Sequence, residues 1–340
     1  MIPPLSDNKH IPSLNLLRGI AALSVCCFHI LPDGFDNYQL IKSIFGKGYL
    51  GLDLFFVISG FIIPYSMYQN NYSIGKFHKF ILKRSLRIEP PYIISFLLII
   101  CMRIVHVNIH NWQHGQDNWV YTHNWKQFGL HFFYLNQYFG YEAYNVVYWT
   151  LAIEFQFYIL MGFLFPLILN RNKIAPLILL FIFCNLFWFL DLPYNWFIFQ
   201  YGFLFLSGIL IFLYTIKRIS LSDFIILLGI VLTLMYYKNQ LEVVLTTIFA
   251  CASIILIRRE WKVTNFLGKI SYSFYLTHGE AAGWFMLYLD TTITNNIMLR
   301  IIATLFAIVF AIGFYYLFEK PALNFSKKIR YVQKRETTDS

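Results

Sequence analysis

The chain is built from apolar stretches of about twenty residues, separated by short breaks rich in charged, Pro, Gly or Asn residues. Twenty apolar residues are the length that a helix needs to cross a hydrocarbon core roughly 30 Å thick. Only 13% of the 340 residues are charged, whereas an average soluble domain carries about 25%. Such a chain cannot cover a water-facing surface. The pattern therefore predicts an all-α, multi-pass helical bundle in the lipid bilayer.

Ten stretches have the required length, and both termini are expected on the same side. The expected helices cover residues 13–31, 48–68, 89–106, 146–169, 174–190, 196–215, 221–237, 241–257, 265–289 and 296–318. The first stretch contains Arg18 and lacks a small-x-small cleavage site, so we expect it to remain as a helix and not to be removed as a signal peptide. These boundaries divide the chain into an N-terminal segment (1–12), a membrane domain (13–322) and a basic tail (323–340).

The basic residues are distributed unevenly between the two sides of this topology. Nineteen of the 27 Lys and Arg residues fall in segments assigned inside, four fall outside, and four lie within or at the ends of helices. Short cytoplasmic loops carry such an excess. We therefore expect cytoplasmic termini, a cytoplasmic segment 69–88, and an outward, interfacial segment 107–145. The formal charge of +10 comes from basic residues that lie between apolar stretches, so it reflects membrane topology. We expect no nucleic-acid partner.

Ionisable residues inside a membrane are costly, and each is a candidate for function. Arg18 and His29 stand eleven residues apart in the first expected helix. Eleven residues make about three turns and rise about 16 Å, so both side chains share one face, with Arg18 nearer the cytoplasm. The alternative is a snorkelling arginine and an interfacial histidine that bonds to a neighbour.

Four further patterns accompany this pair. Residues 51–61 read Gly-Leu-Asp-Leu-Phe-Phe-Val-Ile-Ser-Gly-Phe and include Asp53, and Arg84 and Arg87 are three residues apart. Residues 149–158 read Trp-Thr-Leu-Ala-Ile-Glu-Phe-Gln-Phe-Tyr and include Glu154. Residues 268–278 read Gly-Lys-Ile-Ser-Tyr-Ser-Phe-Tyr-Leu-Thr-His.

In this order the patterns resemble those of the acyltransferase-3 family of membrane proteins, over residues 13–322. Two positions depart from the family pattern. Thr150 stands where Ser is usual, and Asn15 stands where Asp is usual, which could alter how Arg18 is held. We also expect no extracytoplasmic esterase-like domain of the kind that some members carry. That would leave the whole reaction, or the choice of acceptor, to the membrane domain.

The resemblance implies transfer of an acyl group, most often acetyl, from a cytoplasmic coenzyme A thioester to a hydroxyl of a glycan or lipid-linked sugar. Arg84 and Arg87 would hold the phosphates of coenzyme A, unless they only mark the cytoplasmic side. Arg18 would meet the donor where its pantetheine arm enters the membrane. His29 would be the general base for the acceptor hydroxyl, and Asp53 would orient its other ring nitrogen.

Four further residues have expected supporting roles. Glu154 would organise the site more than act directly, and His278 would be a hydrogen-bonded structural histidine as readily as a functional one. Tyr272 and Trp149 would support the site. The five cysteines show no metal-like spacing, so we expect no metal. The resemblance implies acetyl-coenzyme A (or another acyl-coenzyme A) as the co-substrate.

Two other functions fit the same pattern of intramembrane charges. A multi-pass transporter of a glycan precursor or small molecule could line its path with Arg, His and Glu. A catalytically inactive scaffold or sensor could use the same fold. Our leading expectation is an inner-membrane acyltransferase that acts on O-antigen or another surface polysaccharide. The acceptor, the acyl length, an acyl-enzyme intermediate and the oligomeric state are left open by the sequence.

Overall fold

The computed structural model describes residues 11–114, 125–141, 143–169, 197–238, 241–259, 261–289, 292–293 and 295–329. Within these ranges the regular structure is helical. The α-helices are α1 (Pro12–Ile30), α2 (Gln39–Gly46), α3 (Gly51–Gln69), α4 (Phe77–His114), α6 (Trp125–His131), α7 (Trp149–Ile168), α9 (Gly202–Thr215), α10 (Leu221–Lys238), α11 (Leu241–Leu256), α12 (Lys262–Leu289), α13 (Asn296–Phe314) and α14 (Lys320–Ser326).

The expected all-α membrane bundle is confirmed. In the described part of the chain, seven helical spans are long and apolar enough to cross a membrane, and α11 is a shorter apolar helix. The stretch 174–190 lies outside the described residues, so the number of crossings and the side of the termini stay predictions. On α13, Ile301, Leu305 and Val309 are 46%, 57% and 65% exposed. Their spacing of four residues forms one apolar stripe, as expected for a lipid-facing surface.

Helix α4 differs from the expected arrangement. Its 38 residues include most of the segment expected as an inner loop (69–88) and the start of the expected outer connection (107–145). At 1.5 Å per residue the helix is about 57 Å long. Pro90 and Pro91 lie within it, which membrane helices tolerate where neighbouring groups satisfy the freed backbone. Arg84 and Arg87, which were expected on one helical face at the cytoplasmic end, line a cavity inside the bundle.

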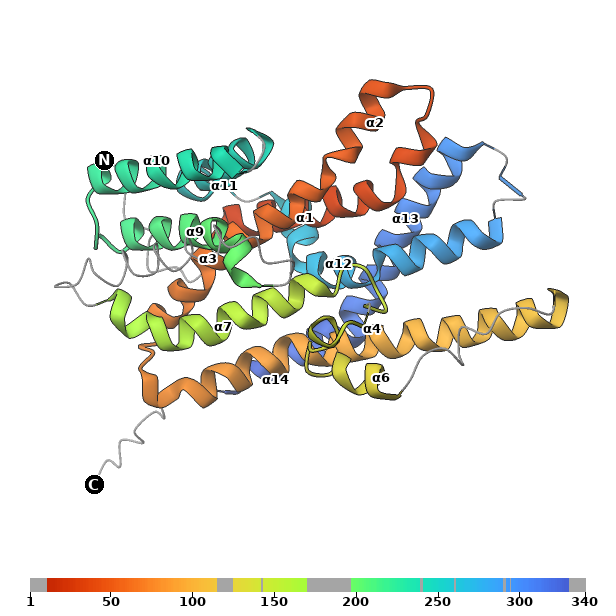
Figure 1. Cartoon of the computed structure of the whole chain (residues 1–340), viewed down its shortest axis with the longest axis horizontal. Helices are drawn as coiled ribbons and strands as arrows, with labels where there is room; N and C mark the ends of the chain where they lie inside the picture. Colours follow the sequence, from red (N-terminus) through yellow and green to blue (C-terminus); the bar gives the residue numbers. More distant parts are fainter. Residues whose placement is uncertain are drawn as a thin grey trace.

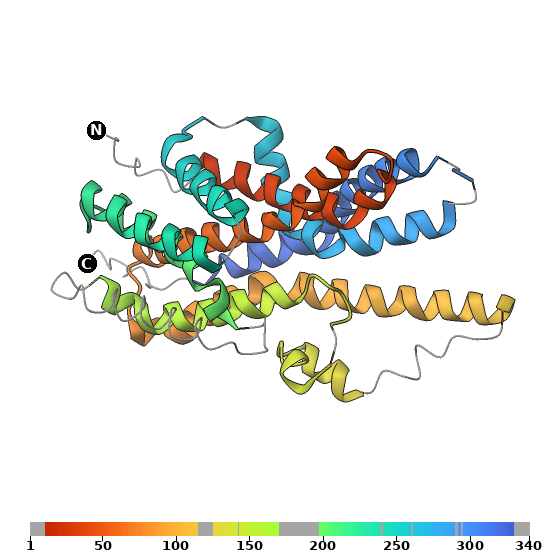
Figure 2. The same ribbon diagram turned by 45° about the horizontal axis from the view of Figure 1, so that its top comes forward.

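Figures 1 and 2 show α1 and α3 in the middle of the bundle, with α10 and α11 on one side and α4 on the other. Helix α1 packs against α12 and α3, and α3 packs against α9. A side chain at Gly60 would meet the backbone of Phe205, and one at Gly208 would meet that of Val57. Small residues let membrane helices approach this closely. The close packing places α1, α3, α7 and α12 around a shared interior.

Candidate active site

Two adjoining cavities lie in this interior. The first, which we call the arginine chamber, has these charged and phenolic lining residues: Arg18, Arg84, Arg87, Glu154, Tyr158, Tyr272, Tyr275 and Glu319. The second, the histidine pocket, has these polar and aromatic lining residues: Phe28, His29, Tyr49, Asp53, Trp149, Tyr201 and Tyr275. Leu52 and Tyr275 line both cavities. The cavities therefore meet at this pair of side chains.

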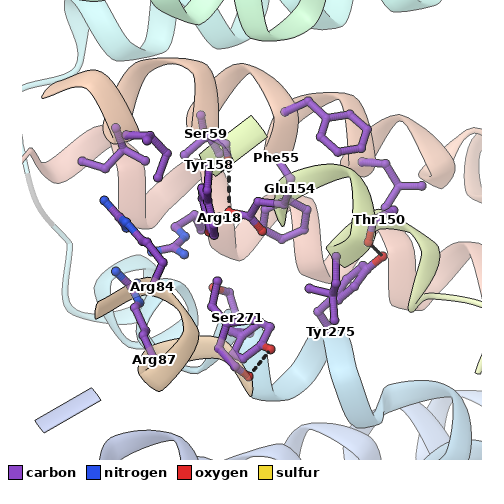
Figure 3. A pocket seen from close by; sticks show the side chains of 18 of the residues that line it. Arg18, Phe55, Ser59, Arg84, Arg87, Thr150, Glu154, Tyr158, Ser271 and Tyr275 are labelled. Carbon is purple, nitrogen blue, oxygen red and sulfur yellow. Dashed lines mark hydrogen bonds between the residues drawn. The ribbon is translucent and has the colours of Figure 1, made fainter. Parts of the chain in front are cut away.

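Figure 3 shows the order of groups along the arginine chamber. Arg84 and Arg87 lie at one end of the view, Thr150 and Tyr275 lie at the other, and Arg18 and Glu154 lie between them. The cationic groups are therefore concentrated away from the junction with the histidine pocket. The chamber is thus polarised along its length, with its positive end toward the first half of α4.

The carboxylate of Glu154 is held by neutral donors. Its Oε1 accepts a hydrogen bond from the hydroxyl of Tyr158 (2.6 Å) and one from the hydroxyl of Ser59 (3.2 Å). Ser59 belongs to α3 and Tyr158 to α7, so this one oxygen links two helices across the chamber wall. The geometry agrees with the expected organising role of Glu154, which stays a prediction.

Glu319 is a second carboxylate of the chamber and was not among the residues expected in the site. It lies in a π-helical turn, Tyr315–Glu319, between α13 and α14. Its Oε2 accepts hydrogen bonds from the backbone N–H (3.0 Å) and the hydroxyl (2.5 Å) of Ser273. Such turns are often found at functional sites. A glutamate in the sequence Phe-Glu-Lys-Pro at the end of the last apolar stretch was the available signal.

The guanidinium groups of Arg18 and Arg87, unlike the two carboxylates, are not held by hydrogen bonds to neighbouring side chains that the structure describes. In the described part of the chain, no side chain forms a hydrogen bond or an ion pair with either group. Arg84 lies over the rings of Phe80 (5.6 Å) and Tyr158 (5.5 Å). Charges inside a membrane protein are usually paired or placed in a polar cavity. The chamber thus presents cationic donors to whatever enters it.

The second centre is a pair of histidines from α1 and α12. The Nδ1 atom of His29 lies 3.0 Å from Nε2 of His278. The Nδ1 atom of His278 lies 3.1 Å from the carbonyl oxygen of Phe274 and 2.9 Å from that of Tyr275. A carbonyl oxygen only accepts, so Nδ1 of His278 carries the proton and its Nε2 accepts one from His29. In the neutral pair, Nε2 of His29 is therefore left as a hydrogen-bond acceptor.

This arrangement corrects the expected partner of His29. Asp53 lines the same pocket and is 9% exposed, but the group on Nδ1 of His29 is His278 and not a carboxylate. The reason is that α12 packs directly against α1, which brings the middle of α12 to the end of α1. A side-chain amide or a second imidazole can fix a histidine tautomer as a carboxylate does.

The other expected residues are also brought to the two cavities. The chamber is lined by Arg18, Arg84, Arg87, Glu154 and Tyr272, and the pocket by His29, Asp53 and Trp149. Tyr272 donates a hydrogen bond to the carbonyl oxygen of Ile88 (2.8 Å) and so joins α12 to α4. The ring of Trp149 packs on that of Tyr201, with centroids 5.6 Å apart.

The structure gives hydrogen-bonding neighbours for both residues that depart from the family pattern. Thr150 keeps the hydroxyl of the usual Ser, and its Oγ1 lies 2.5 Å from the hydroxyl of Tyr275. Asn15 donates a hydrogen bond to Oδ1 of Asn265 (2.7 Å) and so joins the starts of α1 and α12.

Among the described residues, no group of three His, Cys, Asp or Glu side chains could hold a metal ion.

Comparison with known proteins identifies the family. A family model described as an acyltransferase domain, Acyl_transf_3, matches residues 11–316. The chain belongs to the acyltransferase-3 family. The match covers α1 through α13, and thus nearly every residue that lines the arginine chamber and the histidine pocket. No solved structure matches the chain.

Curated relatives of this acyltransferase-3 chain are similar over about half of its length. The peptidoglycan O-acetyltransferase OatA of Listeria monocytogenes is 28% identical over 160 residues, which are 45% of this chain and 24% of that protein. The O-acetyltransferase OatA of Staphylococcus aureus is 28% identical over 170 residues (48% and 26%). A putative O-acetyltransferase of the same species is 30% identical over 166 residues (47% and 25%). The matched part is thus about a quarter of each relative.

Proposed function

We propose that this protein is a membrane O-acyltransferase that moves an acetyl group from acetyl-coenzyme A to a hydroxyl of a carbohydrate acceptor. The observation that carries the proposal is the meeting of two different cavities at Leu52 and Tyr275. One cavity is lined by three arginines, whose guanidinium groups suit an anionic donor. The other presents a histidine whose tautomer leaves a basic nitrogen.

The donor is assigned to the arginine chamber. Coenzyme A carries phosphates and a pantetheine arm with two amide carbonyls, and guanidinium groups form strong charge-assisted bonds with such acceptors. Arg87 and Arg84 lie at the end away from the junction, where the phosphates would enter. Arg18 lies between them and the junction and would bind the arm. The two carboxylates are already held by Ser, Tyr and backbone donors, so Arg18 and Arg87 keep their donors for the ligand.

The acceptor is assigned to the histidine pocket. This cavity has a volume of about 410 Å³, within the range of small-molecule sites. Its aromatic walls, formed by Tyr49, Trp149 and Tyr201, and its carboxylate, Asp53, would suit a sugar ring and its hydroxyls. The peptidoglycan acceptor in the name of the Listeria relative supports a carbohydrate. A polysaccharide and a lipid-linked sugar would both present a sugar ring to this pocket, so the assignment covers both kinds of acceptor.

The two assignments give a balanced transfer step. Nε2 of His29 takes the proton of the acceptor hydroxyl as its oxygen attacks the thioester carbonyl carbon. The new C–O bond forms, the C–S bond breaks, and the sulfur leaves as the thiolate of coenzyme A. The imidazolium of His29 returns its proton to that thiolate. His278 accepts from Nδ1 of His29 throughout and so keeps the imidazole in one tautomer and one orientation.

The proposed setting is the inner (plasma) membrane, with both termini and the donor in the cytoplasm. The excess of Lys and Arg in the segments assigned inside supports this orientation. A transporter would need a continuous path but neither a thioester site nor a general base. Membership of the acyltransferase-3 family supports the enzyme over the transporter.

Thermal stability of the purified protein tests the donor assignment. A ligand that binds only the folded state stabilises it by about 2.7 kcal/mol when its concentration is one hundred times its Kd. We expect acetyl-coenzyme A to raise the melting temperature and acetyl phosphate, which lacks the pantetheine arm, to have little effect. In parallel, surface glycans of a deletion strain should lose base-labile acetyl esters. No shift and unchanged glycans would contradict the proposal.

A further inference from the structure

The two cavities share two lining side chains. Leu52 of α3 and Tyr275 of α12 line both the arginine chamber and the histidine pocket. We call this pair the neck. The most direct route from a donor in the chamber to an acceptor in the pocket runs beside these two residues.

One side of the neck is held in place by several contacts. The hydroxyl of Tyr275 lies 2.5 Å from Oγ1 of Thr150 and donates to the carbonyl oxygen of Val147 (2.9 Å). Its ring packs edge-on against Phe55, with centroids 5.7 Å apart, and the residue is 5% exposed. A buried ring with these partners cannot swing away without losing hydrogen bonds. The aperture is therefore set mainly by the size of Leu52.

The neck is adjacent to the histidine pair. The ring of Tyr275 lies 6.2 Å from that of His278, which in turn bonds to His29. A hydroxyl held at His29 can reach a thioester only if the carbonyl carbon lies close to these rings. With the sulfur on the chamber side and the hydroxyl on the pocket side, the acyl tail has to fit beside Leu52 and Phe55.

From this geometry we propose that Leu52, set against the fixed ring of Tyr275, determines the length of acyl group that the enzyme accepts, and restricts it to short chains. The inference rests on the proposed function and names the residue that selects the donor. One methylene that does not fit an apolar pocket changes discrimination by about 10- to 200-fold. Selection should therefore act between acetyl and the next members of the series.

The test compares the binding of acetyl- and butyryl-coenzyme A to the purified full chain by titrated thermal shift. In the wild type, acetyl-coenzyme A should bind at least about tenfold more tightly. Leu52→Ala should widen the neck and reduce that ratio about tenfold or more. Leu54→Ala is the matched control, because Leu54 lies on the same helix and lines neither cavity. It should keep the wild-type ratio.

A second variant, with a larger side chain at position 52, tests the opposite change in the width of the neck. It leaves no empty space where Leu52 was. Leu52→Phe should narrow the neck, so that free coenzyme A binds as in the wild type and acetyl-coenzyme A binds at least about tenfold more weakly. The role of the neck alone would be overturned if Leu52→Ala kept the wild-type ratio of acetyl- to butyryl-coenzyme A affinity while Leu52→Phe bound acetyl-coenzyme A as tightly as the wild type. It would also be overturned if the wild type bound the two thioesters equally. A wild type that binds none of these thioesters would contradict the proposed function, and the neck with it.

Discussion

The imidazole of His29 is joined to that of His278, with 3.0 Å between Nδ1 and Nε2. The two residues are 249 positions apart in the sequence and meet because α1 packs against α12. Since the backbone carbonyls of Phe274 and Tyr275 fix the proton on Nδ1 of His278, the tautomer of the second ring determines that of the first. His278 is therefore a positioning residue in this account.

Replacement of His278 tests this positioning role. His278→Leu removes the side-chain acceptor for Nδ1 of His29 and leaves His29, among the described residues, only its backbone partner, Val25. Transfer should fall by about one to two orders of magnitude, less than for loss of a general base. His278→Gln offers a carbonyl oxygen at a similar reach and should recover part of the activity. If both variants fold and are equally active, or equally inactive, the tautomer argument is wrong. A purely structural role would predict loss of yield without a difference in rate per folded molecule.

A change at Arg87 tests the donor end of the chamber. Arg87→Ala removes a cationic donor that forms no hydrogen bond or ion pair with a described residue, so folding should be little affected. Acetyl-coenzyme A should bind about tenfold to a hundredfold more weakly. The affinity of Arg87→Lys for acetyl-coenzyme A should lie between those of the wild type and Arg87→Ala, because lysine keeps the charge and loses the planar fork of the guanidinium group. Calorimetric titration measures both. Wild-type affinity in Arg87→Ala, and in the double variant with Arg84→Ala, would leave these residues as markers of topology only.

Two variants at Glu154 distinguish an organising role of this carboxylate from direct participation in the reaction. Glu154→Gln keeps an oxygen that can accept from Tyr158 and Ser59, and removes the negative charge. If the carboxylate only organises the chamber, stability and turnover should stay within about a factor of ten, and the donor should bind no more weakly. Glu154→Ala should lower the free energy of unfolding by about 1–3 kcal/mol, because buried hydroxyls lose their acceptor. Abolished turnover in a stable Glu154→Gln protein would instead indicate direct participation.

Much of this site could be predicted from the sequence, because its parts are local. Helical spacing relates Arg18 to His29, and Arg84 to Arg87, within single helices. The partner of His29 could not be predicted in the same way, because it depends on how α12 packs against α1. Depth in the membrane pointed to Asp53, which does line the pocket. Glu319 was missed for a similar reason, since it belongs to a turn that returns to the chamber only in the folded bundle.

The boundaries of α4 show a second limit of the sequence. Its charged first half was expected on the cytoplasmic side, ahead of the membrane span, because short cytoplasmic segments carry most of the basic residues in membrane proteins. In the structure two of these charges, Arg84 and Arg87, line an interior chamber, and the helix continues through Pro90 and Pro91. Composition identifies polar residues, but it cannot distinguish solvent from a polar cavity.

The orientation in the membrane can be tested at two exposed positions. Asn71 lies between α3 and α4, and Ser43 lies on α2 at the opposite end of α3. In a background without the native cysteines, Asn71→Cys should react with an impermeant maleimide only after the cells are opened. Ser43→Cys should react in intact cells. The reverse pattern would place the donor chamber on the wrong side of the membrane.

The central claim is that His29 is the base that activates the acceptor, and one variant measures it directly. In a deletion strain that carries His29→Ala, we measure base-labile acetyl esters on surface glycans per folded protein molecule, together with the thermal shift of the purified variant by acetyl-coenzyme A. The account predicts that transfer falls by about two to four orders of magnitude while the thermal shift stays close to that of the wild type. Transfer per folded molecule near the wild-type value would contradict it.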